Sequence, residues 1–381
     1  MISRKYLQNT IENKIERNAV TAILGPRQCG KTTISRIIGN KFNAHYFDLE
    51  DPVSFQSLKS SPMQLLSSLS GLIILDEIQR MPDLFPILRV LADRYQNPAH
   101  FLILGSASPH LMKNVSESLA GRIGFVDMSG FDIWETGYSE VKNLWFRGRF
   151  PRSFLGKNDD ESFSWRMDFI RTFLERDIPQ LGITVPSETL RRFWTMLAHY
   201  HGQTWNGSEF ARSLGTTEPT ARRYLDLLSG AYVVRQIQPW FENISKRQVK
   251  SPKVYIADSG ILHALLMLRE DQIQYHPKRG ASWEGFVIDQ IIRRINAPVY
   301  YWATHAGAEL DLFSIKEGKR IGFEIKYSDA PSMTKSMHTA IRDLHLDHLY
   351  VIYPGEKKYP IHDGVMVLPI SELESVLSSS K

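Results

Sequence analysis

Hydrophobic residues in the first 145 positions fall into short runs separated by longer stretches with helical spacing. The runs cover residues 20–24, 44–49, 72–75, 101–104 and 123–128. This alternation is typical of a mostly parallel sheet flanked by helices. We therefore predict an α/β domain over residues 1–145.

The pattern changes twice further along the chain. Residues 160–275 are mainly helical, with one candidate hairpin. Residues 280–375 predict a compact α/β domain. Its elements are a helix over 283–295, strands over 299–302, 310–314 and 321–326, a second helix, and a last strand over 348–353.

The composition excludes several classes of protein. The 381 residues are 43% hydrophobic and 23% charged, which is typical of a globular protein and not of a disordered chain. No apolar run approaches the ~20 residues that a membrane-spanning helix needs. Because the N-terminal segment is also polar, we expect a cytoplasmic protein without a membrane partner. The single cysteine, Cys29, excludes an internal disulfide and a multi-cysteine zinc site.

The net charge of +5 is too small to indicate a nucleic-acid ligand by itself. Its distribution is uneven, because residues 166–256 contain 13 Lys and Arg against 8 Asp and Glu. The excess of this segment equals that of the whole chain. A partner with phosphate groups, such as DNA, is therefore a hypothesis for the middle of the chain.

A glycine-flanked turn follows the first predicted strand. Residues 25–33 fit the pattern G-x-x-x-x-G-K-[ST] between a strand and a helix, and the alternative is a chance glycine loop. Such a loop turns backbone N–H groups and a lysine toward phosphates. We predict that ATP is bound by Gly25, Pro26, Arg27, Gln28, Cys29, Gly30, Lys31, Thr32 and Thr33, with Lys31 catalytic. Cys29, beside the start of the helix, is expected to be a reactive thiol that ATP protects.

The third predicted strand ends in two acidic residues, Asp76 and Glu77. A buried strand that delivers two carboxylates beside a phosphate loop is typical of nucleoside triphosphate hydrolysis with Mg²⁺. We predict that Thr32 and Asp76 hold the metal. Glu77 is predicted to orient or deprotonate the attacking water.

Two further residues are candidates for the same site. Ser106 follows the fourth apolar run, where a small hydroxyl is expected near the γ-phosphate or the attacking water. Arg122, directly before the fifth run, is a candidate to stabilise phosphoryl transfer from within the chain or from a neighbouring subunit. The alternative for Arg122 is an ordinary surface ion pair.

Two helices joined by a short turn are predicted in the middle domain. They cover 206–214 and 218–228, and Gly215 lies in the turn between them. On the second helix, Arg222 and Arg223 are expected to be exposed. Its apolar residues Ala221, Leu225 and Leu228 are expected to face the core.

A hairpin is predicted to follow these helices, with strands within 231–240 and 253–256. Its loop carries Lys246, Arg247 and Lys250. A helix-turn-helix with a basic wing favours contact with a DNA backbone. The alternative for this winged-helix-like middle is a helical lid or an oligomerisation module with solvated arginines.

Four charged residues of the C-terminal domain are expected to converge. Glu324 and Lys326 share a face of one predicted strand because side chains alternate. Asp311 lies on the neighbouring strand and Glu284 on the packing helix. We predict Glu284, Asp311 and Glu324 as ligands of Mg²⁺, with Glu324 and Lys326 catalytic in phosphodiester hydrolysis. The alternative is scattered surface charge.

These blocks together resemble a large prokaryotic family of AAA+ type ATPases with a C-terminal domain of unknown function. The resemblance runs through residues 25–33, 75–80, 105–108, 118–122, 253–260, 308–311 and 323–326. It implies an α/β fold with a P-loop NTPase domain, a winged-helix-like middle and a C-terminal domain similar to the PD-(D/E)xK restriction-endonuclease fold. It also implies ATP and Mg²⁺ as cofactors.

The leading hypothesis is an ATP-hydrolysing, DNA-directed protein whose C-terminal domain cuts or grips DNA. A second hypothesis is a nucleotide-controlled switch or scaffold with a catalytically silent nuclease-like fold. A third is a stand-alone transcriptional regulator. The sequence leaves open whether the chain forms a homo-oligomer and whether Arg122 acts across an interface.

Overall fold

The computed structural model describes residues 2–95, 98–106, 118–180, 185–245 and 247–378. Two compact units divide the chain. The first comprises residues up to 131 together with 149–152 and 230–232, and the second comprises 132–148, 153–229 and the residues from 233 onward. The second unit therefore contains most of the range that we predicted as a middle domain and the whole of the predicted C-terminal domain. Within the described ranges, no helix is long and apolar enough to cross a bilayer.

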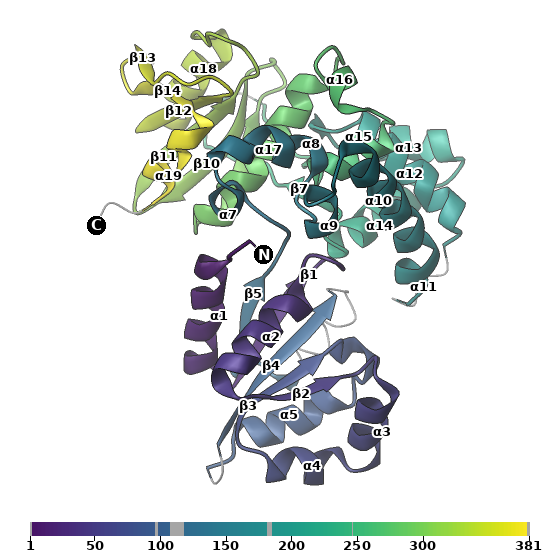
Figure 1. Ribbon diagram of the computed structural model, residues 1–381. Coiled ribbons are helices and arrows are strands. Elements are labelled where there is room, and N and C mark those ends of the chain that lie inside the picture. Colours follow the sequence, from purple (N-terminus) through teal and green to yellow (C-terminus); the bar gives the residue numbers. More distant parts are fainter. Residues whose placement is uncertain (1, 96–97, 107–117, 181–184, 246, 379–381) are drawn as a thin grey trace. The chain divides into compact units, whose positions relative to one another are not determined.

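Five parallel strands form the sheet of the first unit, in the order β2-β3-β4-β1-β5 (Figure 1). They are β1 Val20–Gly25, β2 His45–Asp48, β3 Gly71–Asp76, β4 Ala99–Ser106 and β5 Ile123–Asp127. Every apolar run predicted as a strand is one, which confirms the parallel α/β fold. Since the strands are parallel, their carboxyl ends meet at one edge of the sheet, and ligands bind there in open α/β folds.

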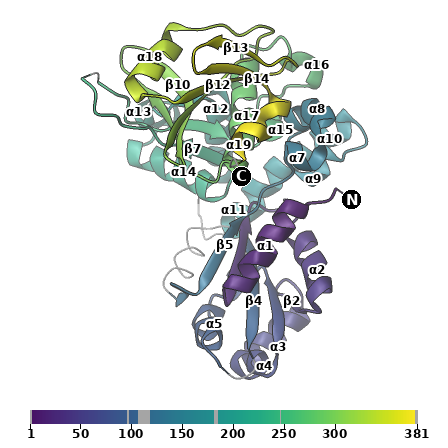
Figure 2. The same cartoon turned by 90° about the vertical axis from the view of Figure 1, so that its left-hand side faces the viewer.

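Helices cover both faces of this sheet (Figures 1 and 2). They are α1 Lys5–Arg17, α2 Lys31–Phe42, α3 Pro52–Ser60, α4 Pro62–Ser68 and α5 Leu84–Ala92. Along β1, Ala22 and Leu24 pack in the cluster that contains residues of α3, α4 and α5, whereas Ile23 packs with α1 and α2. Strands buried on both faces read as continuous apolar runs, which explains why the sequence signal was strong.

The middle part of the second unit is mainly helical, with a small antiparallel sheet in the order β6-β8-β7. Its helices are α7 Ile133–Thr136, α8 Val141–Arg147, α10 Asp159–Thr172, α11 Ile178–Gln180, α12 Ser187–His199, α13 Gly207–Leu214, α14 Glu218–Gly230, α15 Ser259–Leu265 and α16 Glu270–Ile273, and α9 Pro151–Phe154 contains residues of both units. The strands are β6 Gln203–Thr204, β7 Val234–Ile237 and β8 Lys253–Ile256. The two predicted helices and the hairpin are present. Strand β6 was not predicted, because two residues are too few to show an alternation of apolar and polar side chains.

The C-terminal part contains a six-stranded sheet in the order β13-β14-β12-β11-β10-β9. Its strands are β9 Val299–Ala303, β10 Glu309–Lys316, β11 Lys319–Ile325, β12 His348–Tyr353, β13 Tyr359–His362 and β14 Val365–Pro369, and its helices are α17 Arg279–Arg294, α18 Lys335–Leu344 and α19 Leu373–Leu377. Strands β9 to β11 are antiparallel, and β12 and β14 run parallel to β11. The predicted helices and strands are confirmed, but β13 and β14 were not predicted.

The segment between β7 and β8, predicted as a basic wing, lies along strand β9 of the C-terminal sheet. The Trp240 N–H donates to the Tyr301 carbonyl at 2.7 Å, and the Val249 N–H donates to the Ala303 carbonyl at 3.0 Å. The Trp240 ring also contacts the ring of Phe313 at a centroid distance of 5.0 Å. The segment thus covers an edge strand, whose unpaired backbone groups would otherwise be exposed. Contact between the cations of this wing and DNA stays a prediction.

Candidate functional site

The predicted phosphate loop connects β1 to α2 at the carboxyl edge of the first sheet. Gln28 has a φ of 62° and Gly30 a φ of 100°, so the backbone turns through left-handed conformations before the helix begins at Lys31. The Lys31 ammonium donates to the carbonyl oxygens of Gly25 at 3.0 Å and Pro26 at 2.8 Å. It therefore lies within the curve of the loop. Thr33 is exposed on the first turn of α2.

Gly25 is required for steric reasons, because a Cβ at this position would lie 1.9 Å from the Met128 carbonyl oxygen. The chain just after β5 therefore packs directly against the start of the loop. The Cys29 side chain points into the same packing and is fully buried, with Sγ 3.7 Å from the Met128 oxygen. A fully buried side chain does not agree with the expected reactive thiol, so the backbone of Cys29 alone remains a candidate for phosphate contact.

An arginine that the sequence analysis missed ties the loop to the segment after β5. The Arg4 guanidinium donates to the carbonyl oxygens of Cys29 at 3.4 Å, Ser129 at 3.1 Å and Gly130 at 3.0 Å. No pattern in the sequence connects position 4 with these residues. On the outer side of the loop, Arg27 forms an ion pair with Glu50 at 3.2 Å.

Asp76, at the end of β3, is the central acceptor of the site. Its Oδ2 accepts hydrogen bonds from the Thr32 hydroxyl at 2.8 Å and the Tyr46 hydroxyl at 2.6 Å, and its Oδ1 accepts from the Glu77 N–H at 2.9 Å. Tyr46 was not predicted. Thr32 and Asp76 are an oxygen-donor pair of the kind that holds Mg²⁺ beside a bound nucleotide, so these residues fit the metal that the fold implies.

Glu77 has an unusual backbone conformation, with a φ of 55°. A non-glycine residue in this region costs about 1 kcal/mol or more, and such strain is concentrated at functional sites. Its carboxylate accepts a hydrogen bond from the Gln79 amide. Burial raises the pKa of Glu77, and the nearby positive charges of Lys31 and Arg27 partly offset this effect.

The two remaining candidates of this unit lie at different edges of the sheet. Ser106 ends β4 and pairs in register with Gly25, so its backbone lies beside the start of the loop. Ala107 and Ser108 of the same motif lie outside the described residues. Arg122 directly precedes β5, and the first residue of β5 pairs with the first residue of β1. Arg122 therefore lies at the amino edge of the sheet, and the length of β1, about 17 Å, separates it from the loop.

The role predicted for Arg122 within its own chain is therefore corrected. Its guanidinium forms a two-point ion pair with Asp93, with both N···O distances at 2.7 Å. This is the surface pairing that we considered as the alternative. A role for Arg122 in a neighbouring subunit stays a prediction.

In the middle part of the second unit, the helix-turn-helix has the predicted faces. Ala221, Leu225 and Leu228 are fully buried. Arg223 is exposed, and the half-buried Arg222 pairs with Asp226 one turn along the helix, at 3.2 Å. Of the predicted wing cations, Arg247 and Lys250 are exposed and Lys246 lies outside the described residues.

The four charged residues predicted in the C-terminal domain do lie in one region, together with two that were not predicted, Lys253 and Glu309. The Lys253 ammonium, from β8, is nearly buried and faces Glu284 at 3.2 Å and Asp311 at 3.5 Å. It also contacts Glu309. We call Lys253, Glu284, Glu309 and Asp311 the lysine–carboxylate cluster.

Neighbouring groups complete the contacts of this cluster. The Tyr255 hydroxyl donates to Glu284 Oε1 at 2.5 Å, and the Ile325 N–H donates to Asp311 Oδ2 at 2.8 Å. Beside the cluster, Lys326 forms an ion pair with Glu324 Oε1 at 2.7 Å, while the other oxygen of Glu324 is buried without a hydrogen-bond partner among the described residues. Burial and the charge of Asp311 raise the pKa of Glu324.

These residues do not fit a metal ion as they are placed. In the described part of the chain, no three His, Cys, Asp or Glu side chains lie where they could share one. The expected ligands Glu284, Asp311 and Glu324 are instead distributed between two lysines. Sequence reasoning missed Lys253 because it is the first residue of a strand in the preceding region, 31 positions before Glu284.

The buried His201 lies beside this region, and its hydrogen-bond partners hold it in the neutral form. His201 Nδ1 accepts from the Ile256 N–H at 2.9 Å, so its Nε2 donates to the Ala281 carbonyl at 3.1 Å. A Cβ on Gly285 would lie 2.4 Å from this ring, which explains the glycine directly after Glu284. Burial lowers the pKa of His201 to about 3.

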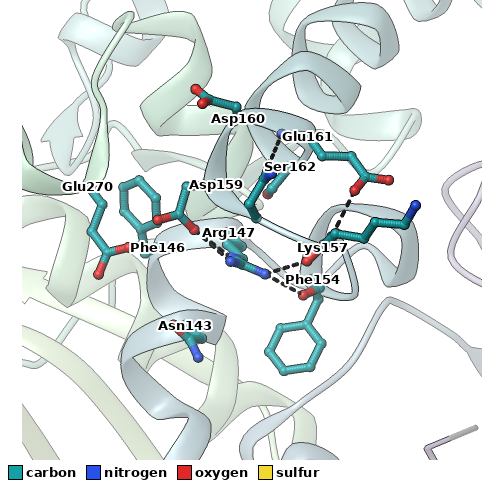
Figure 3. A network of polar contacts seen from close by, with 12 residues as sticks. Asn143, Phe146, Arg147, Phe154, Lys157, Asp159, Asp160, Glu161, Ser162 and Glu270 are labelled. Atoms are coloured by element: carbon teal, nitrogen blue, oxygen red, sulfur yellow. Dashed lines mark hydrogen bonds and ion pairs between the residues drawn. The ribbon is translucent and has the colours of Figure 1, made fainter.

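A second polar network in this unit surrounds Arg147 (Figure 3). Its guanidinium donates to Asp159 at 2.7 Å and to the carbonyl oxygens of Phe154 at 3.3 Å and Gly156 at 2.8 Å. It therefore joins the end of α8 to the start of α10. An open pocket of about 700 Å³ beside it is lined by both acidic residues and arginines, and Asp159 and Glu270 are among the acidic ones. These carboxylates already have cationic partners, Arg147 and Lys142 respectively.

The parallel sheet, the phosphate loop and the Thr32–Asp76 contact define a P-loop NTPase. Comparison with known proteins agrees. Residues 17–137 match the family described as an AAA domain, and residues 138–272 and 279–373 match two domains of unknown function, DUF8612 and DUF4143.

The particular family follows from close relatives. Over 375 residues, the chain is 49% identical to two proteins described as uncharacterized, Rv2008c of Mycobacterium tuberculosis and Mb2031c of Mycobacterium bovis. The match covers 98% of this chain and 85% of each relative. The chain belongs to the family of these two proteins.

A solved structure supports the same fold. The Walker-type ATPase paby2304 of Pyrococcus abyssi is similar with a TM-score of 0.51, over 70% of this chain and 96% of its own length. Its sequence identity is 15%, so the likeness concerns the fold alone.

Proposed function

We propose that this protein hydrolyses ATP and acts on DNA, with Lys31, Thr32, Asp76 and Glu77 performing the nucleotide cycle. The observation that carries the proposal is the 2.8 Å contact between the Thr32 hydroxyl and Asp76. These groups come from the phosphate loop and from the end of another strand. P-loop NTPases use this pair to hold Mg²⁺.

Each residue has a separate task in this proposal. A bound Mg²⁺ would neutralise charge on the β- and γ-phosphates. Lys31 would exchange its two carbonyl acceptors for phosphate oxygens. Glu77, next to Asp76 and held by Gln79, would orient the attacking water and accept its proton.

The proposal of DNA as partner is supported by the order of elements in the middle region. Two helices and a β-hairpin follow one another as in winged-helix proteins, and exposed arginines lie on the second helix and just before the turn, at Arg223 and Arg212. Arginines on such a helix contact phosphates and base edges in the major groove. The wing segment pairs with β9 through its backbone, and its exposed Arg247 and Lys250 are further candidates for phosphate contact.

A second candidate function is a nucleotide-controlled switch or scaffold whose nuclease-like C-terminal domain grips without cutting. The observation that favours it is the pairing of the C-terminal carboxylates with Lys253 and Lys326. The order of α17, three antiparallel strands, α18 and a parallel strand supports the proposed nuclease-like fold. Cutting would need metal ligands that are free to meet at one ion.

Two variants separate the steps of the nucleotide cycle. Lys31→Ala should weaken binding of a fluorescent ATP analogue with Mg²⁺ at least tenfold. Glu77→Gln should bind ATP but hydrolyse it about 100-fold more slowly, because the general base is lost. Lys41→Ala is the matched control, since Lys41 lies exposed on the same helix α2. Normal turnover by Glu77→Gln would refute the assigned role.

DNA binding is tested by fluorescence anisotropy with duplex DNA at several salt concentrations. Arg223→Glu should weaken binding and reduce the slope of log K against log[salt] by about 1 for each phosphate group that the variant no longer neutralises. The control is Arg171→Glu, which replaces an exposed arginine of α10. Incubation of wild type and Glu324→Ala with DNA, ATP and Mn²⁺ then distinguishes cutting from gripping. The proposal is refuted if wild type neither cuts DNA nor shows salt-sensitive binding to it.

A further inference from the structure

The lysine–carboxylate cluster has an ammonium where a nuclease-like site would have a metal. Lys253 is 3% exposed and Asp311 is 7% exposed, so both charges are removed from water. Buried charges of this kind are tolerated only when they are paired. The ammonium of Lys253 provides this pairing for Glu284, Glu309 and Asp311.

The donor capacity of lysine matches its surroundings. An ammonium has three N–H donors and no acceptor, and Lys253 faces three carboxylates. The carboxylate oxygens are further engaged, because Glu284 Oε1 also accepts from the Tyr255 hydroxyl and Asp311 Oδ2 accepts from the Ile325 N–H. A divalent ion, by contrast, needs several oxygen ligands directed at one point.

Lys253 also connects two parts of the second unit. It is the first residue of β8, which pairs with β7 and β6, and its partners come from α17 and β10. The cluster thus joins the small sheet of the winged-helix-like region to the C-terminal sheet. A divalent ion would bind the carboxylates of α17 and β10, but it would not link them to β8, because only Lys253 belongs to that strand.

We infer that Lys253 occupies the position of a divalent cation, so that the C-terminal carboxylates bind this lysine instead of a metal. The chain then has no metal requirement in its second unit. Among the described residues these carboxylates do not converge on one ion as they are placed. Replacing Lys253 with an uncharged residue should leave the three carboxylates uncompensated, so that they can turn toward one Mn²⁺. This inference concerns the second unit only and does not depend on ATP hydrolysis by the first.

The test is thermal unfolding of the full chain with and without Mn²⁺, without nucleotide, followed by tryptophan fluorescence. All 8 tryptophans belong to the second unit, so the signal does not report the phosphate loop. Wild type should show no Mn²⁺-dependent shift in Tm. Lys253→Met should unfold at a lower temperature than wild type, and saturating Mn²⁺ should raise its Tm by about 5 °C.

Controls assign any shift to the cluster. Lys250→Met replaces an exposed lysine three residues earlier and should behave as wild type. Lys253→Met with Asp311→Asn should lose the Mn²⁺ response. If Lys253→Met responds to Mn²⁺ and the double variant does not, the inference is supported. If folded Lys253→Met does not respond, it is refuted.

The comparison of wild type with Asp311→Asn decides the question even if Lys253→Met does not fold. A metal site in the natural protein would give wild type a Mn²⁺-dependent increase in Tm that Asp311→Asn lacks, and this result would overturn the inference. Equal Tm values with and without Mn²⁺ in wild type support it. Isothermal titration of Mn²⁺ into the same proteins provides an independent readout of stoichiometry.

Discussion

Acidification should destabilise the second unit through His263. This side chain is fully buried in α15, and its Nδ1 donates to the Phe146 carbonyl at 3.0 Å. Its Nε2 lies 2.7 Å from the Ser282 hydroxyl, and the same hydroxyl oxygen accepts from the Trp145 indole at 3.0 Å. Because that oxygen already accepts a hydrogen bond, its proton is free to point at Nε2. The neutral ring is therefore satisfied at both nitrogens, and protonation would place a positive charge on a fully buried ring.

The pKa values determine the size and sign of the effect. Burial lowers the pKa of His263 from 6.5 to about 3. At mildly acid pH this histidine is therefore protonated in the unfolded chain and neutral in the folded chain. The contribution to stability is complete above pH 6.5 and is lost progressively as the pH falls from 6.5 toward 3. At pH 5 the loss is about 2 kcal/mol.

The assay is urea unfolding at pH 7.5 and pH 5.0, again followed by tryptophan fluorescence. Wild type should lose more unfolding free energy between these pH values than His263→Gln, by about 2 kcal/mol, because the glutamine does not titrate. Comparing the two pH values for each protein removes the fixed cost of the substitution itself. His338→Gln replaces an exposed histidine and is the matched control.

The reasoning is refuted if His263→Gln and wild type lose the same free energy between the two pH values. The same conclusion follows if His338→Gln reduces the pH dependence as much as His263→Gln does. A flat wild-type profile between pH 7.5 and 5.0 would likewise contradict the neutral, buried state of His263.

Three further substitutions test the packing of the two units. Gly25→Ala should weaken ATP binding at least tenfold by nucleotide titration, since its Cβ would lie 1.9 Å from the Met128 carbonyl oxygen. Gly285→Ala should destabilise the second unit by about 1–3 kcal/mol in urea unfolding, because its Cβ would lie 2.4 Å from the His201 ring. Trp240→Ala should release the segment between β7 and β8 from β9 and make it cleavable in limited proteolysis, because the indole packs on the sheet beneath it.

One glycine provides the control for both glycine predictions. Gly280 lies on α17, and a Cβ there would contact nothing within 4 Å. Gly280→Ala should therefore leave ATP binding and unfolding nearly unchanged. ATP binding by Gly25→Ala at wild-type strength would show that the chain after β5 can move away. Proteolysis of Trp240→Ala at the wild-type rate would show that backbone pairing alone holds the segment.

Much of the first unit could be predicted because each signal is local. A strand buried on both faces must be apolar throughout, so the runs of β1, β3 and β4 identified the centre of the sheet directly. The loop pattern predicts its own backbone geometry, since Gly25 and Gly30 stand where close packing or a positive φ needs glycine. Tyr46 and Arg4 were missed because their partners, Asp76 and the loop carbonyls, lie far away in the sequence.

In the C-terminal region, the pattern along the chain predicted only part of the candidate site. Alternation correctly placed Asp311 opposite Glu324, one position beyond the register pair Leu312–Phe323. It did not reveal the cation between the carboxylates, which comes from another sheet. Three acidic residues with the expected spacing can hold either a metal or a lysine, and spacing does not distinguish these cases.

Sequence pattern was enough to predict most helices and strands, the parallel sheet and the phosphate loop, because burial and backbone conformation act over a few neighbouring residues. The folded arrangement alone shows that Arg122 lies away from the loop, that the wing segment covers β9 and that Lys253 neutralises the carboxylates. A charged group or an edge strand pairs with groups that lie near it in space, however far apart they are in the sequence. That proximity is set by the packing of whole helices and sheets.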